Sequence, residues 1–221
     1  MCGRVTEHIT PADWEALFGI PKPPVEPRYN IPPRERVAIL RLARDGRRES
    51  LLAHWGLEPR LFEGRTGKSL SMFNARAETV ITSPAYGQAF RARRALIPVS
   101  GVLEWRVENG EKRPYLIRRR DSKPLVMAGL YEERDTPEGT RTTCTVITTD
   151  ARGIVQDLHD RMPVLLLSNA WDAWMDAGTP RPDAQRLLYT PYPDGVLEAY
   201  PVNPRIGNVR NQGEDLIRRA G

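Results

Sequence analysis

Two pairs of apolar runs, each interrupted by a short turn, dominate the pattern of hydrophobic and polar positions. The stretch VAILRLARDGRRESLLAHWGL has apolar runs on both sides of Asp45-Gly46, and LEWRVENGEKRPYLIRR has them on both sides of Asn109-Gly110. Asp-Gly and Asn-Gly suit two-residue hairpin turns, because these turns need a positive φ at their central positions. The pattern therefore predicts two β-hairpins.

Two further runs predict strands of the same kind. PLVMAGLYEE and TRTTCTVITT are rich in apolar and β-branched residues and are separated by a turn that contains proline and glycine. In QDLHDRMPVLLL, the apolar end of the stretch predicts a buried strand directly after the polar His-Asp-Arg.

Helix signals are clearest at residues 11–18, where Thr10 can cap the first turn, Pro11 can occupy the first helical position and Gly19 follows the end. Similar reasoning predicts short helices at 84–92, 151–158 and 170–177. In the proline-rich GIPKPPVEPRYNIPP, the prolines lack backbone donors and have fixed φ angles, which predicts an extended surface segment without regular structure.

Adjacent strands with helices between them indicate an α+β fold around a mostly antiparallel sheet. The 221 residues, 40% of them hydrophobic, are enough for one complete core. No repeat, low-complexity linker or break in composition divides the chain. We therefore expect a single compact domain over residues 1–221.

The charge of the chain permits an acidic partner. The formal net charge is +5, and four of the 33 basic residues are lysines, which leaves 29 arginines. The planar arginine fork suits phosphate, so nucleic acid is one interpretation; the base composition of the genome is the other. Two cysteines and the lack of a leader pattern or long apolar run indicate a soluble, cytoplasmic protein.

One of the two cysteines directly follows Met1. Removal of Met1 during maturation leaves Cys2 with a free α-amine beside its thiol, a 1,2-aminothiol that Cys144 cannot provide. The cysteines and histidines show no paired spacing typical of zinc sites, so we expect no metal and no cofactor.

Three polar residues stand at the ends of apolar runs, where partners of a nucleophile could gather. Asn74 occurs in SMFNARAETV, Glu104 in LIPVSGVLEWR and His159 in QDLHDRMPVLLL. Each has a purely structural interpretation: a helix N-cap or turn for Asn74, a solvent-facing or salt-bridged strand residue for Glu104, and a structural histidine for His159. Arg76 and Arg161 are equally typical of surface arginines.

The order MCGR, YNIPP, HWGL, NARAET, LEW, ITTDA, HDRMPVLL and VNPRIGNVRN resembles the SRAP family, named for SOS response-associated peptidases, over nearly the whole chain. The resemblance implies a compact α+β unit with a barrel-like β core, peripheral short helices and a basic groove. It also implies covalent crosslinking to abasic sites in single-stranded DNA, which shields these lesions, in the cytoplasm and on the nucleoid when DNA is bound.

The resemblance implies a role for each matching residue. Cys2 is the crosslinking nucleophile, surrounded by Asn74, Glu104 and His159. The residues expected to contact DNA are listed here: Arg4, Arg76 and Arg161 for phosphates, Trp55 and Trp105 for the sugar or bases, and Thr148 for lining the pocket.

The chemistry of an aminothiol and an aldehyde supports these roles. The amine forms an imine with the open abasic sugar, and the thiol closes a thiazolidine ring. We expect His159 to act on the sugar-ring oxygen, Glu104 to transfer protons to the leaving hydroxyl, and Asn74 to orient the amine. A glutamate beside an imine could also remove the sugar's 2′ proton, which gives a weak lyase side reaction.

Two departures from the family pattern concern the surroundings of the site. Val102 and Leu103 precede Glu104 where the family usually has aromatic residues, and the segment after Trp55 lacks an expected tryptophan, for which Phe62 is the candidate replacement.

Two other functions fit the same residues. One is an autoproteolytic cysteine peptidase of the N-terminal-nucleophile type, and the other is a non-catalytic module that binds single-stranded DNA and in which Cys2 is incidental. For all three functions we expect a monomer that needs no protein partner and no membrane.

Overall fold

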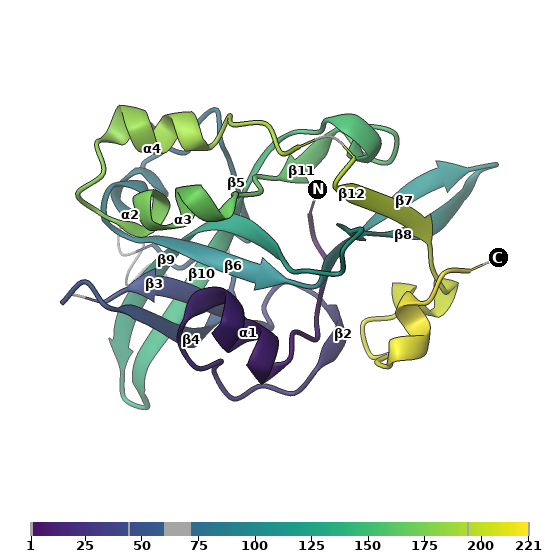
Figure 1. Ribbon diagram of the computed structural model, residues 1–221, viewed down its shortest axis with the longest axis horizontal. Coiled ribbons are helices and arrows are strands. Elements are labelled where there is room, and N and C mark those ends of the chain that lie inside the picture. Colours follow the sequence, from purple (N-terminus) through teal and green to yellow (C-terminus); the bar gives the residue numbers. More distant parts are fainter. Residues whose placement is uncertain (1, 44, 60–71, 194, 221) are drawn as a thin grey trace.

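The largest unit of the fold is a closed ring of five strands (Figure 1). The computed structural model describes residues 2–43, 45–59, 72–193 and 195–220. Pairings run from β10 to β4, β3, β6, β9 and back to β10, and only the β10–β4 pairing is parallel. The strands are β3 (Arg36–Leu42), β4 (Arg48–Trp55), β6 (Arg94–Val99), β9 (Leu125–Thr136) and β10 (Gly139–Asp150). The expected barrel-like core of an α+β fold is confirmed.

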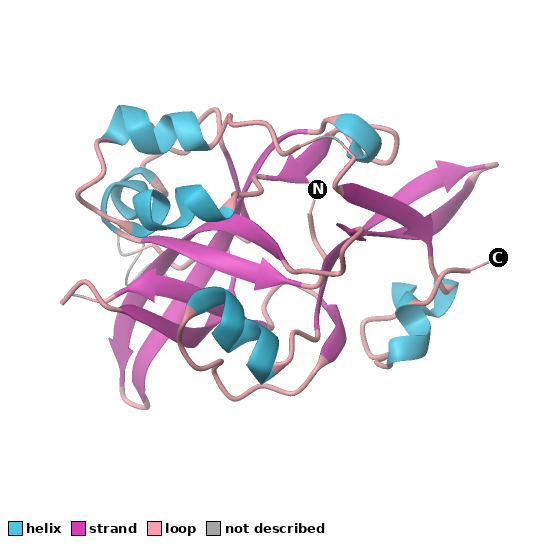
Figure 2. Ribbon diagram, viewed as in Figure 1, coloured by secondary structure: helices cyan, strands magenta, loops and turns pink. Residues whose placement is uncertain are grey.

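A second, antiparallel sheet adjoins the barrel, in the order β12-β8-β7-β1-β2. Its strands are β1 (Val5–Glu7), β2 (Arg28–Ile31), β7 (Gly101–Glu108), β8 (Glu111–Arg119) and β12 (Leu197–Pro201). Two short strands, β5 (Asn74–Arg76) and β11 (Arg161–Pro163), pair with the end of β10. Figure 2 shows the strands in magenta, with the helices around them.

Both predicted hairpins are present. β3 pairs with β4 across a turn in which Gly46 has φ 81°, and β7 pairs with β8 across Asn109 and Gly110, with φ values of 51° and 85°. The positive φ angles explain why glycine occupies position 46 and Asn-Gly occupies positions 109 and 110.

Helix α1 (Pro11–Phe18) has the predicted bounds. Thr10 accepts a hydrogen bond from the Asp13 N–H, and Gly19 ends the helix with φ 72°. The other α-helices are α2 (Gly87–Ala92), α3 (Trp171–Met175) and α4 (Arg181–Leu187). Short 3-10 turns occur at η2 (Gly153–Val155), η3 (Ser168–Ala170), η4 (Pro204–Gly207) and η5 (Glu214–Ile217).

Several local predictions need correction. The predicted helix at 151–158 is only the 3-10 turn η2, whose first residue, Gly153, has a positive φ of 54°. The helix expected at 170–177 ends at Met175, because the Asp176 side chain accepts the Gly178 N–H at 2.8 Å and forms a turn. The helix expected at 84–92 begins only at Gly87, and α4 was not predicted.

The proline-rich segment is also more regular than predicted. Its proline-free part, Arg28–Ile31, forms strand β2 against β1. Four consecutive residues without proline can supply the donors that a sheet needs.

Strand β3 of the barrel is buried on both faces over residues 37–40. On one face, Ala38 and Leu40 belong to an apolar cluster with Trp14 of α1 and Trp174 of α3. Residues of opposite parity, such as Val37, belong to a cluster that includes residues of the second sheet. This second cluster also contains Cys2, so the start of the chain is part of the core between barrel and sheet.

No helix in the described ranges is long and apolar enough to cross a membrane.

Candidate active site

Cys2 is fully buried in the core between the barrel and the second sheet. Its exposed fraction is 0%, and its backbone carbonyl accepts a hydrogen bond from Asn74 Nδ2 at 2.7 Å. Burial raises the pKa of the Cys2 thiol far above its usual value, and the charge of Glu104 raises it further. The thiol is therefore neutral at pH 7, and it lies within the electrostatic range of Glu104.

Asn74 reaches Cys2 from strand β5. This strand pairs in parallel with β10, which places Asn74 beside Val146, and the Tyr86 hydroxyl donates to the Asn74 carbonyl at 3.1 Å. Among the described residues, the buried Asn74 Oδ1 has no hydrogen-bond partner. The side chain thus holds the Cys2 backbone with its amide nitrogen and leaves its oxygen available as an acceptor. The alternative of a helix N-cap is wrong, since Asn74 is a strand residue.

Glu104 enters the same region from strand β7, where it lies opposite Tyr115. The residue is 4% exposed. Burial raises the pKa of Glu104 to about 7, the amino terminus of the chain acts in the opposite direction, and the nearby Asp160 raises it. Its carboxyl group can therefore both donate and accept a proton near neutral pH.

His159 lies in the segment between η2 and β11, with about a quarter of its side chain exposed. Its Nδ1 accepts the Arg161 backbone N–H at 2.9 Å and also lies 2.6 Å from Asp160 Oδ1. One nitrogen cannot accept from Arg161 and donate to Asp160 at once. Burial lowers the pKa of His159, so we assign the neutral form of its imidazole ring, with Nδ1 as acceptor and the proton on Nε2.

Arg161 is held by acidic residues at the edge of this region. Its two terminal nitrogens bond the Glu78 carboxylate at 2.8 and 2.9 Å, and Asp150 at 2.5 Å. The Thr148 carbonyl accepts a fourth bond at 2.8 Å, and the Glu78 interaction raises the pKa of Arg161. An incoming phosphate would have to replace the carboxylates.

Arg4 points instead toward the carboxyl-terminal segment. It donates to Asn30 Oδ1 at 2.5 Å and to the Ile206 carbonyl at 3.0 Å, and its guanidinium lies 5.2 Å from the centre of the Trp105 ring. These contacts join the MCGR, YNIPP, LEW and VNPRIGNVRN motifs. Arg76, by contrast, is exposed, and no ion pair involves it within the described ranges.

The two remaining DNA candidates are core residues. Trp55 is 1% exposed and donates through Nε1 to the Phe73 carbonyl at 2.8 Å. Thr148 is also 1% exposed, on β10 opposite Arg76 and Pro163. Phe62 lies outside the described residues.

The structure thus groups Cys2, Asn74 and Glu104 in a buried centre, with His159 and Arg161 on the adjoining segment. Glu104 and Arg161 line one small internal cavity. The sequence alone did not assign a role to Glu78, Asp150 or Asp160. Alternation along NARAE places Asn74, Arg76 and Glu78 at every second position, which is the one signal that could have linked Glu78 to the site.

The fold and the site define a class of protein: single α+β domains that combine a five-stranded mixed barrel with an antiparallel sheet and bury a second-position cysteine between them. The chain belongs to the SOS response associated peptidase (SRAP) family, whose model matches residues 1–209.

Relatives named as abasic site processing proteins match most or nearly all of the chain. It is 34% identical to the abasic site processing protein YoqW of Bacillus subtilis, over 98% of this chain and 99% of that protein. It is 31% identical to the abasic site processing protein YedK of Escherichia coli, over 99% of each. A more distant relative is the abasic site processing protein HMCES of Xenopus tropicalis, 29% identical over 87% of this chain and 66% of that protein.

Solved structures share the fold. A protein from Bacteroides thetaiotaomicron superposes with a TM-score of 0.77 at 24% identity, covering 89% of this chain and 87% of that one. A phage-related protein from Bordetella bronchiseptica superposes with a TM-score of 0.75 at 30% identity, over 91% and 94% of the two chains.

Proposed function

We propose that this protein links Cys2 covalently to abasic sites in single-stranded DNA through a thiazolidine ring and so shields the lesion. The observation that carries the proposal is the burial of Cys2 beside Asn74 and a glutamate whose pKa is raised to about 7. The relatives' role in abasic site processing supports the same chemistry.

The reaction requires the α-amine of Cys2, which is free once Met1 is removed. Its nitrogen attacks the aldehyde carbon of the open sugar, and loss of one water gives an imine. The Cys2 sulfur then bonds to the same carbon while the thiol proton passes to nitrogen, which closes a five-membered ring. Because amine and thiol belong to one residue, ring closure is intramolecular and favoured by a high effective concentration.

The raised pKa of the Cys2 thiol agrees with this order of events. A peptidase nucleophile needs a thiolate, and burial disfavours the thiolate here. An α-amino group has a reference pKa near 7.7 to 8.0, so an appreciable fraction of it is neutral at pH 7. The amine therefore attacks first, and the neutral thiol adds second.

Each partner has one task. Asn74 Oδ1 accepts a hydrogen bond from the Cys2 α-amine and so orients the lone pair of the amine nitrogen toward the aldehyde carbon. Glu104 protonates the leaving hydroxyl of the carbinolamine and receives a proton from the amine or thiol. His159, with its proton on Nε2, donates to the sugar-ring oxygen and favours the open aldehyde.

Arginines place the backbone of the DNA. Arg76 is exposed, whereas Arg161 exchanges its carboxylate partners for a phosphate. Since phosphate contacts carry no sequence information and the lesion has no base, binding depends on salt and only slightly on sequence. A weak lyase activity through Glu104 accompanies the imine stage.

The test is intact-mass spectrometry of the Met1-free protein with a single-stranded oligonucleotide that carries one abasic site. We expect an adduct with the mass of protein plus DNA minus one water. Cys2→Ala should form no stable adduct, and an acetylated N-terminus should also prevent it. No adduct with demonstrably Met1-free wild type would refute the proposal. Removal of a longer N-terminal extension only when Cys2 and Glu104 are intact would favour the peptidase.

A further inference from the structure

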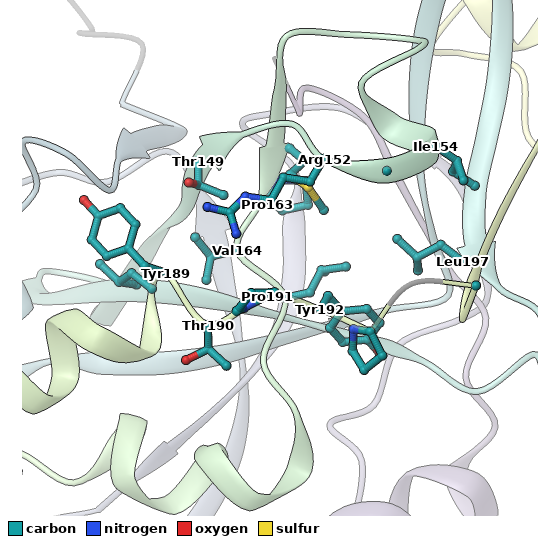
Figure 3. A pocket seen from close by; sticks show the side chains of 16 residues that line it. Thr149, Arg152, Ile154, Pro163, Val164, Tyr189, Thr190, Pro191, Tyr192 and Leu197 are labelled. Atoms are coloured by element: carbon teal, nitrogen blue, oxygen red, sulfur yellow. The ribbon is translucent and has the colours of Figure 1, made fainter.

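A second hollow lies directly beside the candidate active site. This pocket, of about 580 Å³, opens between the segment around η2 and the chain that connects α4 to β12 (Figure 3). Its size falls within the range of about 300 to 1,000 Å³ typical of small-molecule sites. Val164 and Leu165, which follow β11, form part of its apolar lining.

Strand β11 separates the pocket from the candidate active site. Met162 and Pro163 line both this pocket and the small cavity that Glu104 and Arg161 share. The pocket and the cavity are therefore adjacent, because the same side chains of β11 line both. Successive nucleotides of an extended single strand can reach both.

The chemistry of the pocket suits a flat aromatic ring. Tyr189 is 39% exposed and is one of three exposed large hydrophobic residues in the described ranges. The Tyr192 hydroxyl accepts a hydrogen bond from Arg119 at 2.5 Å, which fixes that ring. Prolines on either side of Tyr192 add rigid apolar surface.

Arg152 is the cationic side chain among the described residues that line this pocket. The Arg152 side chain is exposed and extends toward Thr149 and Tyr189 in Figure 3, and within the described ranges it makes no ion pair. Exposed aromatic rings beside an arginine are the combination with which proteins hold single-stranded nucleic acid, by stacking on bases and neutralising phosphates.

We propose that this pocket receives the base of a nucleotide next to the abasic residue, with Arg152 at its phosphate. The proposal rests on the proposed function, because it assumes that the same strand enters the candidate active site. The site accepts any base, since stacking uses the face that all bases share. It lies to one side of β11, so the base matters on one side of the lesion only.

A fluorescent base tests this without requiring crosslinking. The probe is a single-stranded oligonucleotide with tetrahydrofuran, a stable abasic analogue, and 2-aminopurine on one side of it or the other. We expect binding to change the 2-aminopurine emission on one side only. Replacing that neighbour by a second tetrahydrofuran should weaken binding about fivefold or more, the effect of about 1 kcal/mol of lost stacking.

Variants of the pocket sharpen the assignment. Tyr189→Ala should abolish the gain in affinity that the neighbouring base provides. Tyr189→Phe should keep this gain, because stacking needs the ring and not the hydroxyl. Arg152→Ala should lower the dependence of affinity on salt by about one phosphate contact, and the matched Arg91→Ala, an exposed arginine on α2, should leave it unchanged. Denaturant unfolding confirms that each variant is folded.

The outcomes separate this proposal from the crosslinking chemistry. Equal affinity with and without neighbouring bases on both sides, or an unchanged base effect in Tyr189→Ala, would overturn the pocket assignment even if wild type forms the adduct. A one-sided base effect without any adduct on a true abasic site would support the pocket and refute the crosslink. Self-association that Tyr189→Ala abolishes would assign the pocket to a second copy of the chain instead.

Discussion

Two buried glutamates, Glu7 in β1 and Glu104 in β7, show how differently one fold treats the same side chain. Glu7 is 2% exposed, and Glu104 is 4% exposed. Burial raises the pKa of both carboxyl groups. For Glu7, however, the ammonium group of Lys22 at 2.9 Å and the Ile9 N–H at 3.2 Å stabilise the charged form.

Glu104 has a different environment. The acidic Asp160 raises its pKa, and the buried Cys2 thiol lies close enough to respond to its charge. The comparison teaches that burial alone does not make a carboxyl group reactive. A buried cation turns Glu7 into a structural anchor, whereas the surroundings of Glu104 hold its pKa at about 7, where protons can move in both directions.

The largest effect on stability should come from removing the cation that pairs with Glu7. Lys22→Met leaves Glu7 as a buried charge without its cation, and we expect a loss of about 3 to 5 kcal/mol in the free energy of unfolding. Urea denaturation measures it. The rate of adduct formation per folded molecule should stay unchanged; a fall in that rate would show that the anchor also serves the chemistry.

The effect of pH on stability should report the raised pKa of Glu104. The folded-state pKa of Glu104, about 7, exceeds its ordinary 4.5, so the stabilising contribution is complete below pH 4.5 and disappears as pH rises through 7. Each tenfold change in the ionisation constant corresponds to about 1.4 kcal/mol, and Glu104→Gln should therefore be more stable than wild type by about 3 kcal/mol at pH 8. Equal stability of the two proteins at pH 8 would contradict the raised pKa.

The same substitution should slow the chemistry. Glu104→Gln cannot transfer a proton, so we expect the rate of adduct formation to fall about 100-fold, at the low end of general acid–base effects. The limb of the pH–rate profile near pH 7 should vanish with it. Quenched time courses analysed by gel electrophoresis measure both, and an unchanged profile would remove Glu104 from the mechanism.

The smallest effect should come from the carboxylate that holds Arg161. Glu78→Gln weakens a partly exposed ion pair worth about 0.2 to 1 kcal/mol, which should raise affinity for single-stranded DNA by about two- to threefold. Asp183→Asn, which weakens the exposed pair with Arg186 on α4, is the matched control. Fluorescence anisotropy measures the affinities. Weaker binding in Glu78→Gln would show that Glu78 positions Arg161 rather than competing with phosphate.

Local signals in the sequence predicted local structure well. Asp45-Gly46 and Asn109-Gly110 fixed two hairpins, and Thr10, Pro11 and Gly19 fixed both ends of α1, because turns and caps depend on a few adjacent residues. The helix expected at 151–158 failed because nothing in its composition reveals that Gly153 adopts a positive φ.

Long-range relations could not be predicted in this way. The parallel pairing that brings Asn74 beside Val146 depends on the closure of the barrel. The chelation of Arg161 by Glu78 and Asp150 likewise joins separate segments. The motifs named the candidate residues of the site, but their partners and their burial followed only from the tertiary structure.

Strand β10 pairs with four other strands, β4, β5, β9 and β11, and four candidate residues, Asn74, Arg76, Thr148 and Arg161, lie on it or on its short neighbours β5 and β11. Such pairings between distant segments form late and slowly during folding, because the loops between them must close first. In a nascent or partly folded chain, Cys2 is therefore present before Asn74 of β5 and His159, which precedes β11, are placed beside it. Under the proposed function, the chain becomes reactive only once these late pairings have formed.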